Sequence, residues 1–168
     1  GTALPARPGG GPKRLFLCRA PRAPHTPLQA TEPWLARFGH IADLKRRTHV
    51  AMIAQMDDAI GRIVAALDRK GLRENTLIVF SSDNGANLPV GDNGPLRDQK
   101  GSVYEGGVRV PAFAHWPSRL PPGRLVTQPL HMVDWHPTLL RLAGATPAPG
   151  PLDGRDLWPA LVDPKAAA

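Results

Sequence analysis

The spacing of hydrophobic and polar positions predicts one long helix near the middle of the chain. From Lys45 to Lys70, apolar residues recur three and four positions apart, as on one face of a helix. The members of this stripe are Met52, Ile53, Met56, Ile60, Ile63, Val64 and Leu67. Gly71 follows at the position where a glycine commonly ends a helix.

Continuous apolar runs predict buried strands. "NTLIVFSS" at 75–82 and "VPAFAHWP" at 110–117 show no polar alternation, which is typical of strands covered on both faces. "RLFLC" at 14–18 predicts a shorter buried strand, and Cys18 at its end is interpreted as a small buried hydrophobe. A helix, a short loop and then a strand indicate an α/β layer architecture.

The remaining segments predict two more helices and two loops. "EPWLARF" at 32–38 is a short helix with a proline in its first turn, and "MVDWHPTLLRLAG" at 132–144 is an amphipathic helix ending on its glycine. Residues 86–109 are rich in Gly, Asn and Asp, and loops of such length are usually functional. "PLDGRDLWPALV" at 151–162 is predicted to form a terminal loop and turn.

Composition limits the class of protein. A chain of 168 residues with 42% hydrophobic and 21% charged residues is typical of one globular domain. No apolar run approaches the ~20 residues that span a bilayer, and the first residues lack the apolar region of a signal peptide, so we expect no membrane partner. The net charge of +7 lies in the first fifty residues, where a basic stretch is more often a solvated face or tail than a binding groove, so we expect no nucleic-acid partner.

Asp83 and Asn84 directly follow the predicted strand at 75–82. One interpretation is a turn, because Asn-Gly commonly reverses the chain after a strand. The other is a metal site, because carboxylate and amide oxygens at the carboxyl end of a strand suit a hard cation such as calcium. The two residues alone do not decide between these interpretations.

Lys100 and His25 are candidates for contacting an anion. Lys100 lies in the glycine-bordered loop "RDQKGSVYEGG", where a compact cation can meet an anionic group, or simply be solvated. His25 stands between two prolines in "APHTP", which fix the direction of its ring, so it can donate to an anion or a leaving oxygen or serve only the structure.

Taken in order, these segments resemble the sulfatase family of the alkaline-phosphatase-like superfamily, and in particular its arylsulfatase-type members. The matching stretches are "APHTPLQA", "RRTHVAMIAQMDDAIGRIVAALDRKGLRENTLIVFSSDNG", "NGPLRDQKGSVYEGGVRVP" and "DGRDLWPAL". The resemblance implies an α/β fold, part of an alkaline-phosphatase-like sheet with helices on both faces, incomplete in this chain. We expect an irregular segment at 1–13, the second half of a sulfatase catalytic domain at 14–162, and a tail at 163–168.

The resemblance also implies the chemistry. Asp83 and Asn84 fall on positions that give ligands to a divalent cation, usually calcium. Lys100 falls on the lysine that contacts the sulfate, and His25 on the histidine that contacts the sulfate ester and assists the leaving group. The implied activity is hydrolysis of small-molecule or glycan sulfate esters by an exported enzyme, in the periplasm, in the lysosome or outside the cell.

The chain also departs from the family. The family's nucleophile is a formylglycine, made from the cysteine or serine of a Cys-x-Pro-Ser-Arg motif, and "CRAPR" at 18–22 does not match that motif. The early acidic pair that completes the cation site is missing too. We therefore expect the chain alone to hydrolyse little or no sulfate ester. We also expect it to be poorly soluble or self-associating, since half a sheet leaves an open edge.

Two other functions stay open. Relatives in the same superfamily hydrolyse phosphate esters or phosphonates with similar metal ligands. Alternatively, a truncated and non-catalytic product binds polyanions through a basic face formed by Arg14, Arg19 and Arg22, with an affinity that falls as salt rises.

Overall fold

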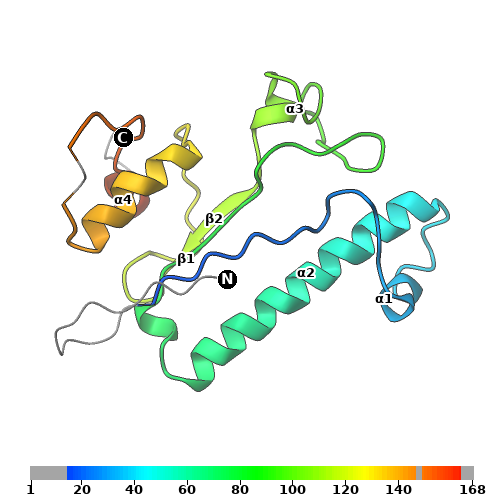
Figure 1. Ribbon diagram of the computed structural model, residues 1–168, viewed down its shortest axis with the longest axis horizontal. Coiled ribbons are helices and arrows are strands. Elements are labelled where there is room, and N and C mark those ends of the chain that lie inside the picture. Colours follow the sequence, from blue (N-terminus) through cyan, green and yellow to red (C-terminus); the bar gives the residue numbers. More distant parts are fainter. Residues whose placement is uncertain (1–14, 147–148, 164–168) are drawn as a thin grey trace. The chain divides into compact units, whose positions relative to one another are not determined.

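The computed structural model describes residues 15–146 and 149–163 and divides them between two compact units. The first unit holds the residues up to 66 together with 82–110, and the second holds 67–81 with the residues from 111 onward (Figure 1). The predicted irregular segment at 1–13 and nearly all of the predicted tail lie outside the described residues. No helix in the described part is long and apolar enough to cross a membrane.

The long helix α2 (Leu44–Arg69) confirms the helix predicted from the apolar stripe. At its start the Asp43 carboxylate accepts a hydrogen bond from Arg46 N at 2.6 Å, which satisfies one of the free amides of the first turn. At its end Gly71 has a φ of +64°, and Leu72 N donates to Leu67 O at 2.9 Å. The predicted glycine cap is thus confirmed, because only glycine adopts this left-handed conformation without strain.

The predicted stripe on α2 is buried only in part. Met52 is 7% exposed and its sulfur accepts a hydrogen bond from Gln29 N at 3.4 Å, whereas the adjacent Ile53 is 39% exposed. The other five members are half-buried. Ile53 lies about 100° further round the helix than Met52, so it stands at the margin of the apolar face rather than in its centre.

The helix predicted at 32–38 is confirmed as α1 (Glu32–Ala36), with a proline in its first turn. The strand predicted at 14–18 is wrong, since residues 15–20 form no regular element and Leu15, Phe16 and Leu17 are 46–65% exposed. Cys18 is exposed, so its interpretation as a buried hydrophobe is also wrong. An apolar run forms a strand only beside a hydrogen-bonding neighbour, and no strand in the described part pairs with this one.

The second unit contains the sheet. The strands β1 (Ile78–Ser81) and β2 (Ala112–His115) pair antiparallel and confirm the two strands predicted from "NTLIVFSS" and "VPAFAHWP". Phe80 lies opposite Phe113, and their rings stack 5.2 Å apart. Coverage on both faces is wrong, because Val79 is 38% and Phe113 53% exposed. With two strands in the described residues, each strand is flanked by a neighbour on one side only.

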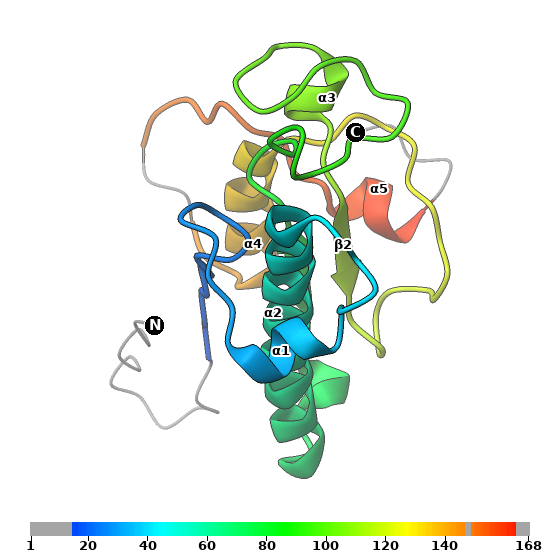
Figure 2. The ribbon, with the colours of Figure 1, turned by 90° about the vertical axis from the view of Figure 1, so that its right-hand side faces the viewer.

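The helix predicted at 132–144 is confirmed as the 3₁₀ turn η2 (Met132–Asp134) followed by α4 (Trp135–Leu142), with a left-handed glycine after it. Another 3₁₀ turn, η1 (Arg73–Asn75), precedes β1, and the short helix α3 (Glu105–Val108) interrupts the long loop. The prediction of only a loop and turn at 151–162 is wrong, since the chain forms α5 (Trp158–Val162) there (Figure 2). Asp156 Oδ1 accepts from Trp158 N at 3.0 Å at the start of α5, and a proline occupies its first turn.

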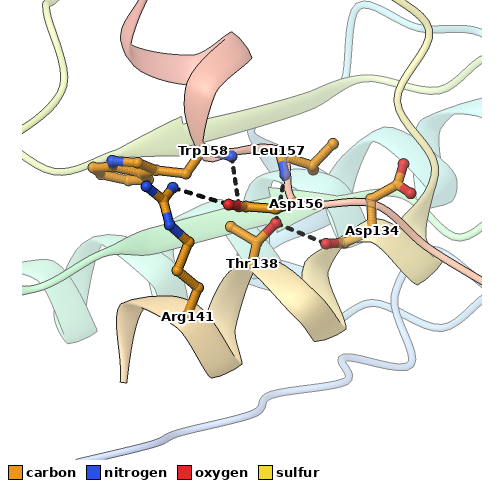
Figure 3. A network of polar contacts seen from close by, with 6 residues as sticks. All are labelled: Asp134, Thr138, Arg141, Asp156, Leu157 and Trp158. Carbon is orange, nitrogen blue, oxygen red and sulfur yellow. Dashed lines mark hydrogen bonds and ion pairs between the residues drawn. The ribbon is translucent and has the colours of Figure 1, made fainter. Parts of the chain in front are cut away.

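The core of the second unit is built around a buried threonine (Figure 3). Thr138 on α4 is fully buried; its hydroxyl donates to Asp134 O and accepts from Leu157 N, both at 2.7 Å. Arg141 pairs with Asp156 at 2.9 Å. These bonds fasten the segment before α5 to α4.

Candidate functional site

The candidate site residues Asp83, Asn84 and Lys100 lie on a loop of the first unit that folds back on itself. Its backbone is closed by three hydrogen bonds between segments distant in the sequence. They are Gly85 N to Gly107 O at 2.9 Å, Gly106 N to Arg97 O at 2.7 Å, and Lys100 N to Ala86 O at 3.0 Å. The last of these holds the backbone of Lys100 against the residue two positions after Asn84.

Glycines make this close folding possible. Gly85, Gly106 and Gly107 are all buried. A Cβ added at Gly85 would collide with the carbonyl of Gly106, and one added at Gly106 would collide with the carbonyl of Asp98. A Cβ at Gly107 would collide with the carbonyl of Ser102. The contacts are to backbone atoms, which cannot swing away, so any side chain at these positions forces the loop segments apart.

The loop is also anchored to α2. Arg46 on α2 donates from a guanidinium nitrogen to Val90 O at 2.6 Å. One turn further along, His49 is half-buried, and burial together with the positive charge of Arg46 lowers its pKa below the usual 6.5.

Asp83 and Asn84 present two oxygen ligands of the kind that a hard cation takes. Asp83 is exposed, and its carboxylate has no hydrogen-bond or ion-pair partner in the described part of the chain. Asn84 is half-buried, and its amide nitrogen donates to Gly85 O at 2.9 Å, while its amide oxygen has no hydrogen-bond partner in the described part of the chain. Ser82 donates to Asn84 O at 3.0 Å and holds the turn.

The oxygen atoms of this pair are of the type that calcium binds, but they are fewer than a calcium site needs. Calcium takes about six to eight oxygen ligands. Within residues 15–146 and 149–163, no group of three or more His, Cys, Asp or Glu side chains is placed to hold a metal ion. Asp83 and Asn84 therefore supply only a part of a coordination shell.

Lys100 is exposed, with Gly101 next to it at a φ of +91°. Its ammonium group has no hydrogen-bond or ion-pair partner among the described residues, so it remains available to an anion. Nearby on the same loop, the Arg97 guanidinium stacks 3.6 Å from the centre of the Tyr104 ring, which braces the segment that carries the lysine.

His25 lies on a different segment of the first unit. It is exposed, and its Nδ1–H donates to Thr26 O at 2.8 Å. Since Nδ1 carries the proton in this arrangement, Nε2 of the neutral ring is an acceptor and donates only when the ring is protonated. Among the described residues no hydrogen bond or ion pair links His25 to Asp83, Asn84 or Lys100. Three of the four predicted site residues thus lie on one hydrogen-bonded loop, and His25 lies on another segment of the same unit.

One further residue of the loop was missed by the sequence analysis. Asn93 is half-buried, and its side chain bonds to Ala86 and to Asp98 on either side of the fold. The available signal was a second Asp-Asn-Gly run, at 92–94, nine residues after the first at 83–85. That run predicts a turn and not the partners of its side chain.

Comparisons with known proteins give the family. A family model described as Sulfatase matches residues 10–145. Arylsulfatase J of Mus musculus is 40% identical over 148 residues, which are 87% of this chain and 25% of the relative. Steryl-sulfatase of Mus musculus is 45% identical over 119 residues, which are 65% of this chain and 19% of the relative. The chain thus spans about a quarter or less of the length of these curated relatives.

Solved structures agree on the fold. The crystal structure of Ps i-CgsB in complex with k-i-k-neocarrahexaose is 44% identical and superposes with a TM-score of 0.79, over 82% of this chain and 31% of that one. The predicted fold class, an incomplete part of an alkaline-phosphatase-like α/β structure, is therefore confirmed. Since the sulfatase model matches well over half of its residues, the chain belongs to the sulfatase family.

Proposed function

We propose that the native polypeptide to which this sequence belongs hydrolyses sulfuric esters. The observation that carries the proposal is the hydrogen bond from Lys100 N to Ala86 O, in a chain of the sulfatase family. It holds the backbone of Lys100 beside the residue two positions after Asn84, so the lysine and the Asp83–Asn84 pair belong to one folded loop. A lysine and the divalent cation that the pair would hold suit an anionic ester, because both positive charges would neutralise charge on its oxygens.

Each predicted site residue has a role in this proposal. Asp83 and Asn84 hold a divalent cation, Ca²⁺ in the first instance, through the carboxylate and through the amide oxygen that the bond to Gly85 O leaves free. When bound, such an ion polarises the sulfate group. Lys100 contacts the sulfate as a compact positive charge. His25, when protonated, donates from Nε2 to the oxygen of the leaving group.

The nucleophile of the proposed reaction is a formylglycine. No Cys-x-Pro-Ser-Arg motif occurs in the 168 residues, and the one cysteine, Cys18, is followed by "RAPR". The proposal therefore assigns residues 14–162 to the second half of a catalytic domain and expects little hydrolysis by the 168-residue chain alone. In this proposal, these residues bind the cation and the sulfate group.

The substrate is proposed as a sulfate ester of a small molecule or a glycan. One relative is named for steryl sulfates, and Ps i-CgsB was solved with a neocarrahexaose bound. Specificity in such sites comes from loops around the pocket, so these two differing ligands support the class of ester rather than one compound. An exported location, in the periplasm, the lysosome or outside the cell, belongs to the same proposal.

The reaction class is tested by giving the native polypeptide two substrates that differ only in the ester. Hydrolysis of 4-nitrophenyl sulfate is compared with that of 4-nitrophenyl phosphate, with and without a chelator. Preference for the sulfate, lost with the chelator, supports the proposal. Preference for the phosphate would move the protein to the phosphate-ester branch of the superfamily and overturn it.

A further inference from the structure

The side chain of Asn93 links two separate parts of the loop at 82–110, which carries Asp83, Asn84 and Lys100. Its Oδ1 accepts a hydrogen bond from Ala86 N at 2.8 Å, and its Nδ2 donates to Asp98 O at 2.9 Å. Because a backbone amide only donates and a backbone carbonyl only accepts, this orientation of the carboxamide is fixed. Ala86 comes two residues after Asn84, and Asp98 comes two residues before Lys100. One half-buried side chain thus links the backbone just after the proposed cation ligands to the backbone just before the lysine.

The partner on the lysine side is itself held in an unusual conformation. Asp98 has a φ of +71°, in the left-handed region that few residues other than glycine adopt. Its own carboxylate accepts from Gln99 N at 2.9 Å, which supports this turn. Gly106 packs so closely on the Asp98 carbonyl that no Cβ fits between them. The carbonyl is therefore held between Gly106 and the Asn93 amide.

We propose that Asn93 is a positioning residue that sets the spacing between the Asp83–Asn84 pair and Lys100. This inference rests on the proposed function, which gives those residues their roles. The folded loop needs a hydrogen-bond acceptor facing Ala86 N and a donor facing Asp98 O. Asparagine supplies both from one short side chain. Aspartate keeps the acceptor, lacks the donor and faces the Asp98 carbonyl with a negative charge, while alanine supplies neither.

Amide hydrogen exchange in the full ¹⁵N-labelled chain tests the positioning. The variants are Asn93→Ala and Asn93→Asp, and Asn87→Ala is the matched control, because Asn87 lies exposed on the same loop and no hydrogen bond of its side chain is present in the described part. Asn93→Ala loses three side-chain hydrogen bonds, counting a longer one from Nδ2 to Ala86 O at 3.4 Å. It therefore raises exchange at Lys100 and Ala86 by about tenfold or more. Asn93→Asp raises it at Lys100 and changes Ala86 less, and Asn87→Ala leaves both unchanged.

The result that overturns the proposal is exchange at Lys100 in both Asn93 variants within about twofold of the wild type. The amides of α2 in the same spectra report whether each variant is folded. If Asn93→Ala unfolds, the near-isosteric Asn93→Asp decides alone.

A second measurement separates positioning from mere stabilisation of the loop. Mn²⁺, which takes the same oxygen ligands as Ca²⁺, broadens amide signals according to their distance from it. In the wild type we expect broadening at Gly85 and at Lys100. In the Asn93 variants, the ratio of the broadening at Lys100 to that at Gly85 changes by about twofold or more. Such a change indicates that the distance from the ion to one of the two amides has changed. An unchanged ratio beside faster exchange would overturn the proposal, because the bonds would then not set the spacing.

This design keeps the two proposals apart. If Mn²⁺ broadens neither Gly85 nor Lys100 in the wild-type chain, the cation site of the proposed function fails in this chain. The hydrogen-exchange comparison needs no metal and still decides whether Asn93 holds Lys100.

Discussion

Replacing Thr138 with valine should destabilise the second unit measurably although the shape of the side chain is kept. Thr138 is fully buried, and valine removes both its bond to Asp134 O and its bond from Leu157 N. The first loss costs about 1 kcal/mol, and the second leaves a buried N–H without a partner, at about 1–3 kcal/mol. Burial of the methyl group that replaces the hydroxyl offsets up to about 1 kcal/mol of this loss. We therefore expect Thr138→Val to lower the free energy of unfolding by about 1–3 kcal/mol.

Urea unfolding followed by tryptophan fluorescence measures this loss, since Trp116 and Trp158 pack edge to face at 5.7 Å in the same unit. With a typical slope of about 2 kcal/mol per molar urea, the midpoint should fall by about 1 M. Thr76→Val is the control, because the Thr76 hydroxyl makes one exposed bond, to Leu72 O, and its loss should cost at most about 0.5 kcal/mol. Equal midpoints for Thr138→Val and Thr76→Val would refute the reasoning.

Two further predictions concern the first unit. Gly85→Ala should lower the free energy of unfolding by about 2 kcal/mol or more, because its Cβ meets the Gly106 carbonyl. Gly61→Ala on α2, with open space around it, should raise the free energy of unfolding by about 0.5–1 kcal/mol. Melting temperatures of the two variants that shift in the same direction would contradict this. The lowered pKa of His49 means that the unfolded chain binds its proton more readily, so stability is full above about pH 6.5 and falls as the pH drops through 6.5 toward the folded pKa. His49→Gln should flatten that part of the stability–pH curve, and an unchanged slope would show that burial and the charge of Arg46 do not act as described.

Elements with a local cause could be predicted from the sequence. The period of α2 and its end at Gly71 depend on residues near one another in the chain, and both are confirmed. Burial depends on neighbours from elsewhere, which is why the coverage of β1 on both faces and the strand at 14–18 were wrong. The short α5 was missed because its start depends on the side chain of Asp156, itself held by α4.

In the candidate site too, features with a local cause could be predicted and contacts made on folding could not. The resemblance to sulfatases named Asp83, Asn84 and Lys100, and all three lie on the folded loop. The hydrogen bonds of Asn93 could not be predicted from the sequence, because its partners Ala86 and Asp98 become neighbours only when the loop folds. Their distances in the chain, seven and five residues, match no regular element.

The measurement that tests the central claim most directly is the rate of aryl sulfate hydrolysis by the native polypeptide with Lys100→Met. We expect kcat/KM to fall by about a hundredfold or more, because a charge that neutralises the sulfate is removed. Lys70→Met, at an exposed lysine after α2, should leave the rate unchanged. Wild-type activity in Lys100→Met would contradict the account, since the loop that holds this lysine would then serve no part of the reaction.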